Sequence, residues 1–408
     1  MKSFKLSSTT RLTPLLGACF SFALLTGCGG SVAPEWEAFY SHQEDSIEWQ
    51  RTVDIDSFGG IITTGQTINT GADRTQDALV AKHDKQGNLI WAINVDLGQP
   101  AARSDEATTD AVIDFNGNTY VVGTIYRPEN PISIYGSFLL KVDSLGELAW
   151  SNVISDKEKT RDVELANGLI YTGGDATRVF DLEGNEQLSI NHGDANVWDI
   201  EVDNQGNIYS AGYAFTSKHN ANGILVWQLN NPEGLTHSTS LALTNDGGAV
   251  VAHLISSEDK IRVIKISNSG SVIWTKTIND PAASAGAMPG LPLVALDNQS
   301  NIIVINSNAQ GRKTTKLNSN GNTLWSNTSK GNVIRQVITD ADNNIYVYGS
   351  GKGEKYDPNG KSLLIIEPPA AAANTTGAIT LSGADIFVAS SIVNNGTFDL
   401  YIAKYLNR

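Results

Sequence analysis

The chain is poor in thiols and in the spacings that bind transition metals. Its 408 residues include two cysteines, Cys19 and Cys28, and both lie near the N-terminus. The rest of the chain can therefore form no disulfide and offers no thiolate nucleophile or thiolate metal ligand. The histidines show no HxH or HExxH spacing, so the sequence predicts no transition-metal site; they are His42, His83, His192, His219, His237 and His253.

Motifs of the common enzyme classes are also missing. The sequence contains no G-x-S-x-G elbow, P-loop or dinucleotide fingerprint, and we predict no catalytic residue from motifs. Asp340-Ala-Asp342-Asn-Asn344 begins like a calcium loop, but it lacks the glycine at the sixth place and the following glutamate. We interpret it as a turn in which an aspartate accepts hydrogen bonds from its own backbone. Catalytic carboxylates on segments far apart in the sequence stay open as an alternative.

Positive charge is scarce. Lys and Arg number 29 against 43 Asp and Glu, which gives a formal net charge of -14. An acidic surface repels phosphate backbones and anionic headgroups, so we expect no nucleic-acid partner.

The first residues have the pattern of a secretion signal. Lys2, Lys5 and Arg11 precede an apolar run from Leu12 to Leu25, which is too short to span a bilayer. The run ends in Leu25-Thr26-Gly27-Cys28, which resembles the bacterial lipobox, in which the cysteine becomes the lipidated first residue. An ordinary signal peptide that ends near a cysteine is the alternative.

The lipobox resemblance predicts three segments: a signal peptide over 1–27, a lipidated flexible tether over 28–34 and one domain over 35–408. Loss of residues 1–27 removes three basic residues and brings the net charge to -17. Glycines rather than aspartate follow Cys28, which in a Gram-negative source implies an outer-membrane anchor, on the periplasmic or the cell-surface side.

Two alternating motifs fill the rest of the chain. The first is a strand, a polar turn and a second strand, as in AVIDFNGNTYVVGT (111–124) and IEVDNQGNIYSAGY (200–213). Asp and Asn bind their own backbone in such turns, and Gly accepts positive φ, so each motif predicts a β-hairpin. The second motif carries a tryptophan in its outer strand, as in SFLLKVDSLGELAWSNV (137–153).

Together the motifs predict a repeated four-stranded meander. The inner-hairpin turns recur at intervals of 37 to 58 residues, starting near Asp56, Asp114, Ala166, Asp203, Thr244, Asp297, Asp340 and Leu381. This is the range of propeller blades, so we predict an all-β fold with a single β-propeller of eight blades, or seven if the weak third unit merges with a neighbour. The last unit lacks one strand, and residues 36–41 are expected to supply it and close the ring.

The repeat also carries a family resemblance. DALVAKHDKQGNLIWAINV (77–95) and DAVIDFNGNTYVVGT (110–124) resemble the bacterial SBBP β-propeller repeat. The resemblance implies the fold and a secreted protein, and it implies almost nothing about chemistry. More loosely, the chain is similar to PQQ-like eight-bladed propeller lipoproteins, although its turns have a shorter Asp-to-Gly spacing. We expect Trp91, Trp150, Trp274 and Trp325 to pack between blades.

The order of strands places the two kinds of connection on opposite faces. The short Asp-Gly-Asn turns fall on one face, which we call the turn face. The longer, irregular connections fall on the other, which we call the connection face; they include 65–76, 97–108, 124–136, 213–223 and 279–290. Variable loops on a rigid scaffold usually carry binding, so Tyr126, Arg127 and Tyr135 are candidate partner-binding residues, with ordinary surface packing as the alternative.

Acidic residues gather in the predicted innermost strands of the first four blades. Asp54, Asp110, Asp162, Glu164, Asp199 and Glu201 alternate with apolar neighbours and are predicted to line a central channel. They could bind calcium or a cationic ligand, they could pair with Arg51, Arg161 and nearby backbone amides, or they could stay hydrated in a wet channel.

These observations favour a monomeric lipoprotein whose connection face binds a protein or polysaccharide partner, without catalysis and without a required cofactor. The alternative is a propeller enzyme of the lactonase, lyase or quinoprotein type, with calcium or a cofactor in the channel.

Overall fold

The computed structural model describes most of the chain beyond the signal segment. The described residues are 30–42, 46–69, 75–98, 104–128, 133–155, 157–193, 196–212, 214–231, 237–255, 260–279, 292–307, 311–330, 333–350, 352–368, 377–394 and 397–407. All the regular elements in these ranges are β-strands, labelled β1 to β33. Cys28 and the predicted signal peptide lie outside the described residues.

Successive groups of four strands pair antiparallel in chain order. The first group is β3 (Ile47–Ile55), β4 (Ile61–Ile68), β5 (Gln76–His83) and β6 (Leu89–Val95). The second is β7 (Asp105–Ile113), β8 (Thr119–Pro128), β9 (Ser133–Val142) and β10 (Leu148–Ser155). A single parallel pairing of Gln76 with Asp105 joins these two groups.

The weak third unit forms a sheet of its own, with β11 (Thr160–Ala166), β12 (Leu169–Gly174), β13 (Ala176–Phe180) and β14 (Glu186–Asn191). The fourth sheet is β15 (Val197–Val202), β16 (Ile208–Gly212), β17 (Phe215–His219) and β18 (Leu225–Asn230). The fifth is β19 (His237–Leu243), β20 (Ala249–Ile255), β21 (Lys260–Ile266) and β22 (Val272–Asn279).

The remaining strands continue the pattern to the C-terminus. The sixth sheet is β23 (Leu293–Leu296), β24 (Ile302–Ser307), β25 (Gly311–Leu317) and β26 (Thr323–Lys330). It is followed by β27 (Ile334–Thr339), β28 (Ile345–Gly349), β29 (Lys352–Tyr356) and β30 (Ser362–Ile366). The last three strands are β31 (Gly377–Ser382), β32 (Asp385–Asn394) and β33 (Thr397–Leu406).

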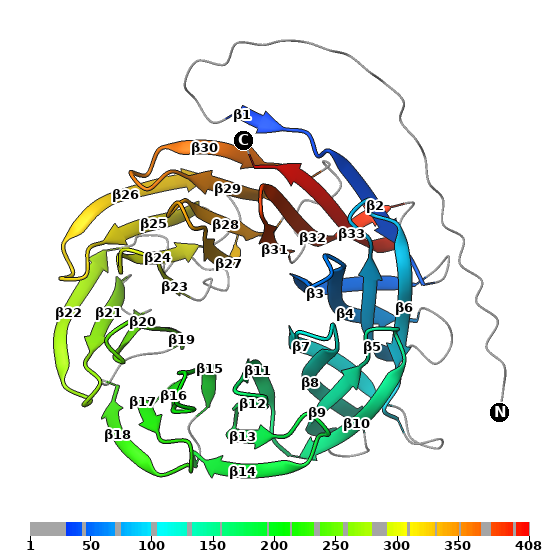
Figure 1. The fold of residues 1–408 in the computed structure, drawn as a ribbon, viewed down its shortest axis with the longest axis horizontal. Coiled ribbons are helices and arrows are strands. Elements are labelled where there is room, and N and C mark those ends of the chain that lie inside the picture. The colour runs from blue at the N-terminus through cyan, green and yellow to red at the C-terminus, as the bar shows by residue number, and fades with distance from the viewer. Residues whose placement is uncertain are drawn as a thin grey trace.

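The sheets stand around a central opening, with the first strand of each sheet innermost (Figure 1). This is the architecture of a β-propeller. Second strands such as β16 and β28 are buried along their whole length. The core therefore lies between neighbouring sheets, where for example Val250 and Ala252 of β20 pack with Ile302 and Val304 of β24.

The two ends of the domain meet in one sheet. Strand β2 (Trp36–Tyr40) pairs antiparallel with β33, which gives the strand order β2-β33-β32-β31. The Lys404 ammonium lies 2.9 Å from the Glu35 carboxylate, and the ring centroids of Phe39 and Tyr401 are 5.4 Å apart. Residues from the N-terminal end thus occupy the place of the missing outer strand.

One segment differs from the expected flexible tether. Gly30–Val32 forms β1, which pairs parallel with Leu364–Ile366 of β30. The outer strand of a sheet leaves one row of backbone amides and carbonyls unpaired, and an adjacent extended segment can satisfy them. The chain is thereby held against the propeller before it reaches β2.

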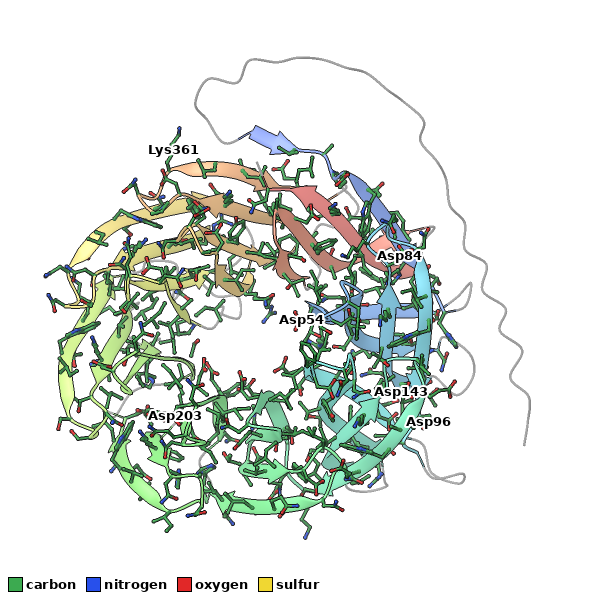
Figure 2. All side chains as sticks on the ribbon, in the orientation of Figure 1. Asp54, Asp84, Asp96, Asp143, Asp203 and Lys361 are labelled. Atoms are coloured by element: carbon green, nitrogen blue, oxygen red, sulfur yellow. The ribbon has the colours of Figure 1, made fainter. Side chains whose placement is uncertain are left out.

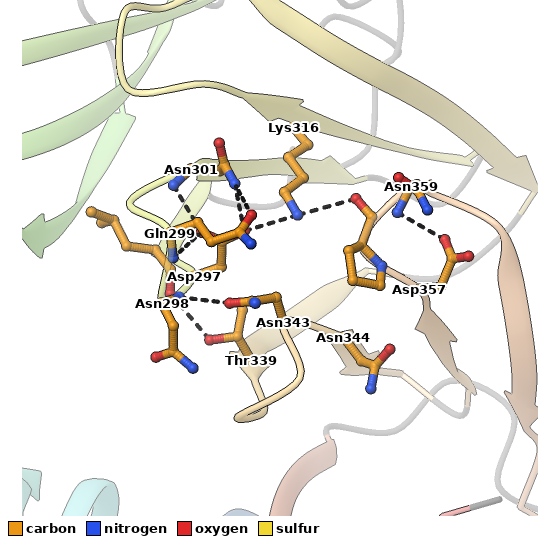
Figure 3. A network of polar contacts seen from close by, with 12 residues as sticks. Asp297, Asn298, Gln299, Asn301, Lys316, Thr339, Asn343, Asn344, Asp357 and Asn359 are labelled. Carbon is orange, nitrogen blue, oxygen red and sulfur yellow. Dashed lines mark hydrogen bonds and ion pairs between the residues drawn. The ribbon is translucent and has the colours of Figure 1, made fainter.

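The predicted turns are built by their aspartates. In the turn between β23 and β24, Asp297 Oδ1 accepts hydrogen bonds from the amides of Gln299 and Asn301 at 3.0 and 2.8 Å (Figure 3). Asp297 Oδ2 accepts from the Asn301 side chain and lies 2.8 Å from the Lys316 ammonium. Burial alone would raise the pKa of Asp297, but the hydrogen bonds from Lys316 and Asn301 hold the pKa below its usual value.

The tryptophans bind the neighbouring sheet, as expected from the sequence. Trp325 Nε1 donates to the Pro358 carbonyl in the outer turn of the next sheet at 3.0 Å, and Lys316 Nζ donates to the same carbonyl at 3.1 Å. A Cβ on Gly360 would lie 2.6 Å from the Trp325 ring, so glycine is required there by packing as well as by its φ of +85°. Trp91, Trp150 and Trp274 donate to turn carbonyls in the same way.

Candidate functional site

The predicted inner carboxylates form a row along three neighbouring innermost strands. Asp110 lies on β7, Asp162 on β11 and Asp199 on β15. Each accepts a backbone hydrogen bond from the next sheet: Asp110 from Val163 N at 3.2 Å, Asp162 from Ile200 N at 2.7 Å and Asp199 from Leu241 N at 2.7 Å. The carboxylates therefore link adjacent sheets at the rim of the opening.

Neutral side chains make the same link elsewhere in the ring. Ser240 Oγ accepts from Val294 N at 3.2 Å, and Gln336 Oε1 accepts from Ile379 N at 2.8 Å. Because a hydroxyl and an amide replace the carboxylate without loss of the contact, the position needs a hydrogen-bond acceptor and does not need a charge.

The acids in the row shift one another's pKa values. Burial, the Asp162 charge and a hydrogen bond to Asp162 raise the pKa of Asp110 well above its usual value. Burial, followed by the charges of Asp162 and Glu201, does the same to the pKa of Asp199. Burial also raises the pKa of Asp162, against hydrogen bonds from both neighbours and from Ile200 N that lower it. All three acids thus have raised pKa values, and burial is the largest cause for each.

Glu164 and Glu201 lie further along the same strands, toward the turn face. Burial and the charges of Glu201 and Asp162 raise the pKa of Glu164 to about 8. Burial and the Asp162 charge raise the pKa of Glu201 to about 7. Asp54 lies apart from this group on β3, exposed to the central opening (Figure 2), where burial by the surrounding strands raises its pKa.

The inner carboxylates do not make a cage for a metal ion. Among the described residues, the acidic or histidine groups with ligand atoms all within 4.8 Å of one another are Asp77, Asp96 and Glu106, which lie elsewhere. The row instead extends from sheet to sheet, one acid per strand. A single ion could contact neighbouring members only in part.

The expected arginine partners are placed differently from the prediction. Arg161 forms an ion pair with Asp175 at 2.8 Å and stacks over the Trp198 ring at 4.8 Å, so it turns away from the inner carboxylates. Arg51 has no ion-pair partner among the described residues. Of the partners considered for the inner acids, the backbone amides of the next sheet bind Asp110, Asp162 and Asp199, whereas no ion pair to Arg51 or Arg161 forms among the described residues.

Arg51 instead borders a cavity of about 530 Å³ at the central opening. The cavity is lined by the innermost strands β3, β7, β27 and β31, and Arg335 and Asp54 also border it. Burial and the positive charge of Arg335 lower the pKa of Arg51, and burial lowers that of Arg335. Sequence reasoning missed Arg335, although its place two residues into an innermost strand was a usable signal.

The candidate partner-binding residues lie at the connection face. Tyr126 and Arg127 are half-buried near the end of β8, and Tyr126 is in register with Tyr135 of β9. The side chain of Tyr135 lies outside what the structure describes. No helix in the described ranges is long and apolar enough to cross a membrane.

Comparison with known proteins gives a fold and no family. No family model and no curated protein matches the chain. Among solved structures, the Dos1 propeller aligns with 90% of this chain and 94% of its own length, with a TM-score of 0.62 and 12% identity. Since the identity is low, this likeness shows a β-propeller and nothing of its chemistry.

Two further solved structures align over shorter parts of the chain. One is a protein of unknown function from Bacteroides caccae, with 13% identity, a TM-score of 0.40 and coverage of 57% of this chain and 90% of its own. The other is a putative gluconolactonase, with 13% identity, a TM-score of 0.37 and coverage of 60% of this chain and 89% of its own.

Proposed function

We propose that the chain is an outer-membrane lipoprotein of the SBBP-repeat type, and that its propeller binds a protein or polysaccharide through the connection face without catalysis. The propeller is proposed to be a ring of eight blades, closed where β2 pairs with β33. Lipid on Cys28 holds it to the membrane, and β1 keeps the link from lipid to ring short. The protein acts as a monomer, and no nucleic acid takes part.

The observation that carries the proposal is the use of the inner acids as links between sheets. A catalytic carboxylate must be free to meet a substrate, whereas Asp110, Asp162 and Asp199 each accept an amide from the next sheet. The turn aspartates also accept backbone hydrogen bonds, in their case from amides of their own turns. Three of the six inner acids, Asp110, Asp162 and Asp199, thus have a role in holding the sheets together.

The connection face is the more variable of the two faces of the propeller. Its connections differ in length and composition from sheet to sheet, whereas those of the turn face repeat one design. Tyr126 and Arg127 have the side-chain types that often anchor an interface. Their position at the end of β8 puts rigid strand residues beside the connections.

A second function is favoured by the cavity at the opening. Its volume of about 530 Å³ suits a small molecule, and Arg51 and Arg335 offer positive charge without a carboxylate partner in the described residues. Glu164 on the innermost strand β11 has its pKa raised to about 8, so it can hold a proton at neutral pH. A propeller enzyme of the lactonase, lyase or quinoprotein type is therefore the alternative. Calcium or a cofactor in the channel would belong to this alternative.

Site-specific photo-crosslinking in cells tests the binding face. A benzophenone amino acid at Tyr126 is expected to give a discrete adduct in envelope fractions. The matched control is the same amino acid at Phe115, which is 85% exposed on the turn face. Adducts from Phe115 alone, or from neither position, would overturn the proposal.

The enzyme alternative has its own readout. Purified protein is assayed for hydrolysis of a panel of lactones, with and without calcium, beside the Glu164→Gln and Arg335→Gln variants. Turnover that both substitutions abolish would replace the binding function with catalysis. Absence of turnover together with adducts from Tyr126 supports binding.

A further inference from the structure

Three carboxylates meet at the boundary between the first two sheets, on the connection face. Asp77 lies at the start of β5, Asp96 directly follows β6, and Glu106 is the second residue of β7. Oxygen atoms of all three lie within 4.8 Å of one another. Figure 2 shows Asp96 well away from the central opening that Asp54 borders, so this group is separate from the row of inner acids.

Glu106 is the unusual member of the group. Its side chain is fully buried, at 0% exposure, and neither carboxylate oxygen has a donor in full hydrogen-bonding geometry, although the Ser104 hydroxyl and the Leu97 amide lie close enough to act on it. Oδ1 of Asp77 is also buried and unpartnered. A buried carboxylate without well-formed hydrogen bonds loses its hydration with little compensation, which costs several kcal/mol or more. A bound cation or a proton would compensate the negative charge of this carboxylate.

The surroundings add negative charge and no compensating positive one. Burial, with the charges of Asp96 and Asp77, raises the pKa of Glu106 to about 7, against hydrogen bonds from the Ser104 hydroxyl and Leu97 N that lower it. Burial and the charges of Asp96 and Asp105 raise the pKa of Asp77. No lysine or arginine pairs with the three acids in the described part of the chain. The group therefore repels itself when its members ionise.

We propose that Asp77, Asp96 and Glu106 form a binding site for a divalent cation, of which calcium fits best. Calcium takes oxygen ligands at about 2.3 to 2.6 Å, so oxygens on opposite sides of one ion lie about 4.6 to 5.2 Å apart, which covers the spacing seen here. The group contains no histidine or cysteine, the ligands that zinc and copper prefer. Asp96 is exposed and gives an ion access from solvent, and water completes the coordination.

The site would join two sheets that share little backbone pairing. A single residue pair, Gln76 with Asp105, connects β5 to β7 directly. A cation held by one acid from β5, one that follows β6 and one from β7 would tie the two sheets at the connection face. The inference is independent of the proposed binding partner, because it concerns only how these sheets are held.

Calorimetry with calcium chloride on the chelator-treated, lipid-free domain tests the proposal. We expect one site per chain, with a dissociation constant below about 1 mM, as in extracellular calcium modules. Unfolding followed in parallel should show a higher Tm in calcium than in chelator. No binding heat together with an unchanged Tm would overturn the proposal.

Glu106→Gln separates a cation site from a merely protonated acid. The amide fills the same space without charge, so we expect at least about tenfold weaker calcium binding and a Tm in chelator at or above that of the wild type. Glu147→Gln, an exposed acid on the turn face, is the matched control and should bind calcium normally. Asp162→Asn should also bind normally, which excludes the inner row. Normal binding by Glu106→Gln, or loss of binding by Asp162→Asn, would overturn the assignment.

Discussion

At the scale of single residues, buried lysines connect the turn of one sheet to the outer turn of the next. Lys316 is the clearest case, with 2% of its side chain exposed beside Asp297, whose side chain is fully buried. Its ammonium also reaches the Pro358 carbonyl of the following sheet (Figure 3). Lys82 with Asp56 repeats the ion pair, and Lys141 and Lys265 repeat the contact to the next sheet.

Removing one partner of this pair should be more harmful than removing both. Lys316→Met leaves the buried Asp297 carboxylate without its cation, although its turn hydrogen bonds remain. We therefore expect a loss of about 3 kcal/mol in the free energy of unfolding, at the lower end for a broken buried pair. Denaturant titration monitored by tryptophan fluorescence measures it.

The control is the double variant Lys316→Met with Asp297→Asn. Asparagine keeps the turn, as Asn220 and Asn318 do in outer turns of this chain, and it leaves no buried charge. The double variant should therefore recover most of the loss. A double variant as unstable as Lys316→Met would show that the pair acts through packing and not through charge.

At the scale of elements, local sequence predicted the hairpins well. Asp, Gly and Asn specify a turn within five residues, and the predicted turns at Asp114, Asp203 and Asp297 each join antiparallel strands. The tryptophan contacts could also be predicted, because the residue recurs at one place in the repeat. Both features depend on contacts that repeat from one sheet to the next.

Contacts that occur once could not be predicted in this way. Arg161 pairs with Asp175, which lies between β12 and β13 and accepts a hydrogen bond from Lys159 N just before β11. No repeat encodes this contact. Asp77, Asp96 and Glu106 come from both sides of two irregular connections, and only the folded sheets bring them together. The sequence signal that could have indicated this group is that all three acids flank irregular connections.

Strand β2 provides the element-scale prediction. Without residues 30–41, β33 would be left as an unpaired edge, and the Trp36 contact to the Lys85 carbonyl would be lost. We expect the truncated domain to unfold at a Tm lower by about 5 °C or more, since such a deletion removes many buried contacts, and to associate through the exposed edge. Calorimetry and size-exclusion chromatography measure the two effects.

Trp36→Ala is the companion variant. It keeps β2 and its backbone pairing while removing the ring that packs over Gly87. This variant should be destabilised but stay monomeric. If the truncated domain is as stable and as monomeric as the intact one, β2 does not serve to cover the edge of β33.

At the scale of the whole molecule, buried acids and buried histidines set opposite pH dependences. Burial, with smaller contributions from neighbouring charges, raises the pKa of Glu48, Glu106 and Glu201 to about 7 and that of Glu164 to about 8. Burial lowers the pKa of His83 to about 4 and that of His253 to about 3. The histidines therefore lower stability only below their ordinary pKa of about 6.5, where the unfolded chain binds more protons.

Above about pH 6.5 the buried glutamates, and not the histidines, decide whether the free energy of unfolding rises or falls with pH. From about pH 6.5 to about pH 8 the folded state still holds protons on these glutamates, whereas the unfolded state has released them below pH 5. The folded state binds more protons, so the free energy of unfolding falls as pH rises through this window. Each proton lost also adds to a net charge of -14, and the added self-repulsion acts in the same direction.

The Tm in chelator should therefore fall by about 2 to 5 °C between pH 6.5 and pH 8.5. Glu164→Gln should reduce this slope, because the amide has no proton to lose, while the exposed Glu147→Gln should leave it unchanged. Calcium should reduce the slope as well if Glu106 binds it, since the bound ion compensates the ionised carboxylate. A Tm that stays constant or rises through this window would mean that the buried glutamates are already ionised at neutral pH and are compensated by contacts other than those described here.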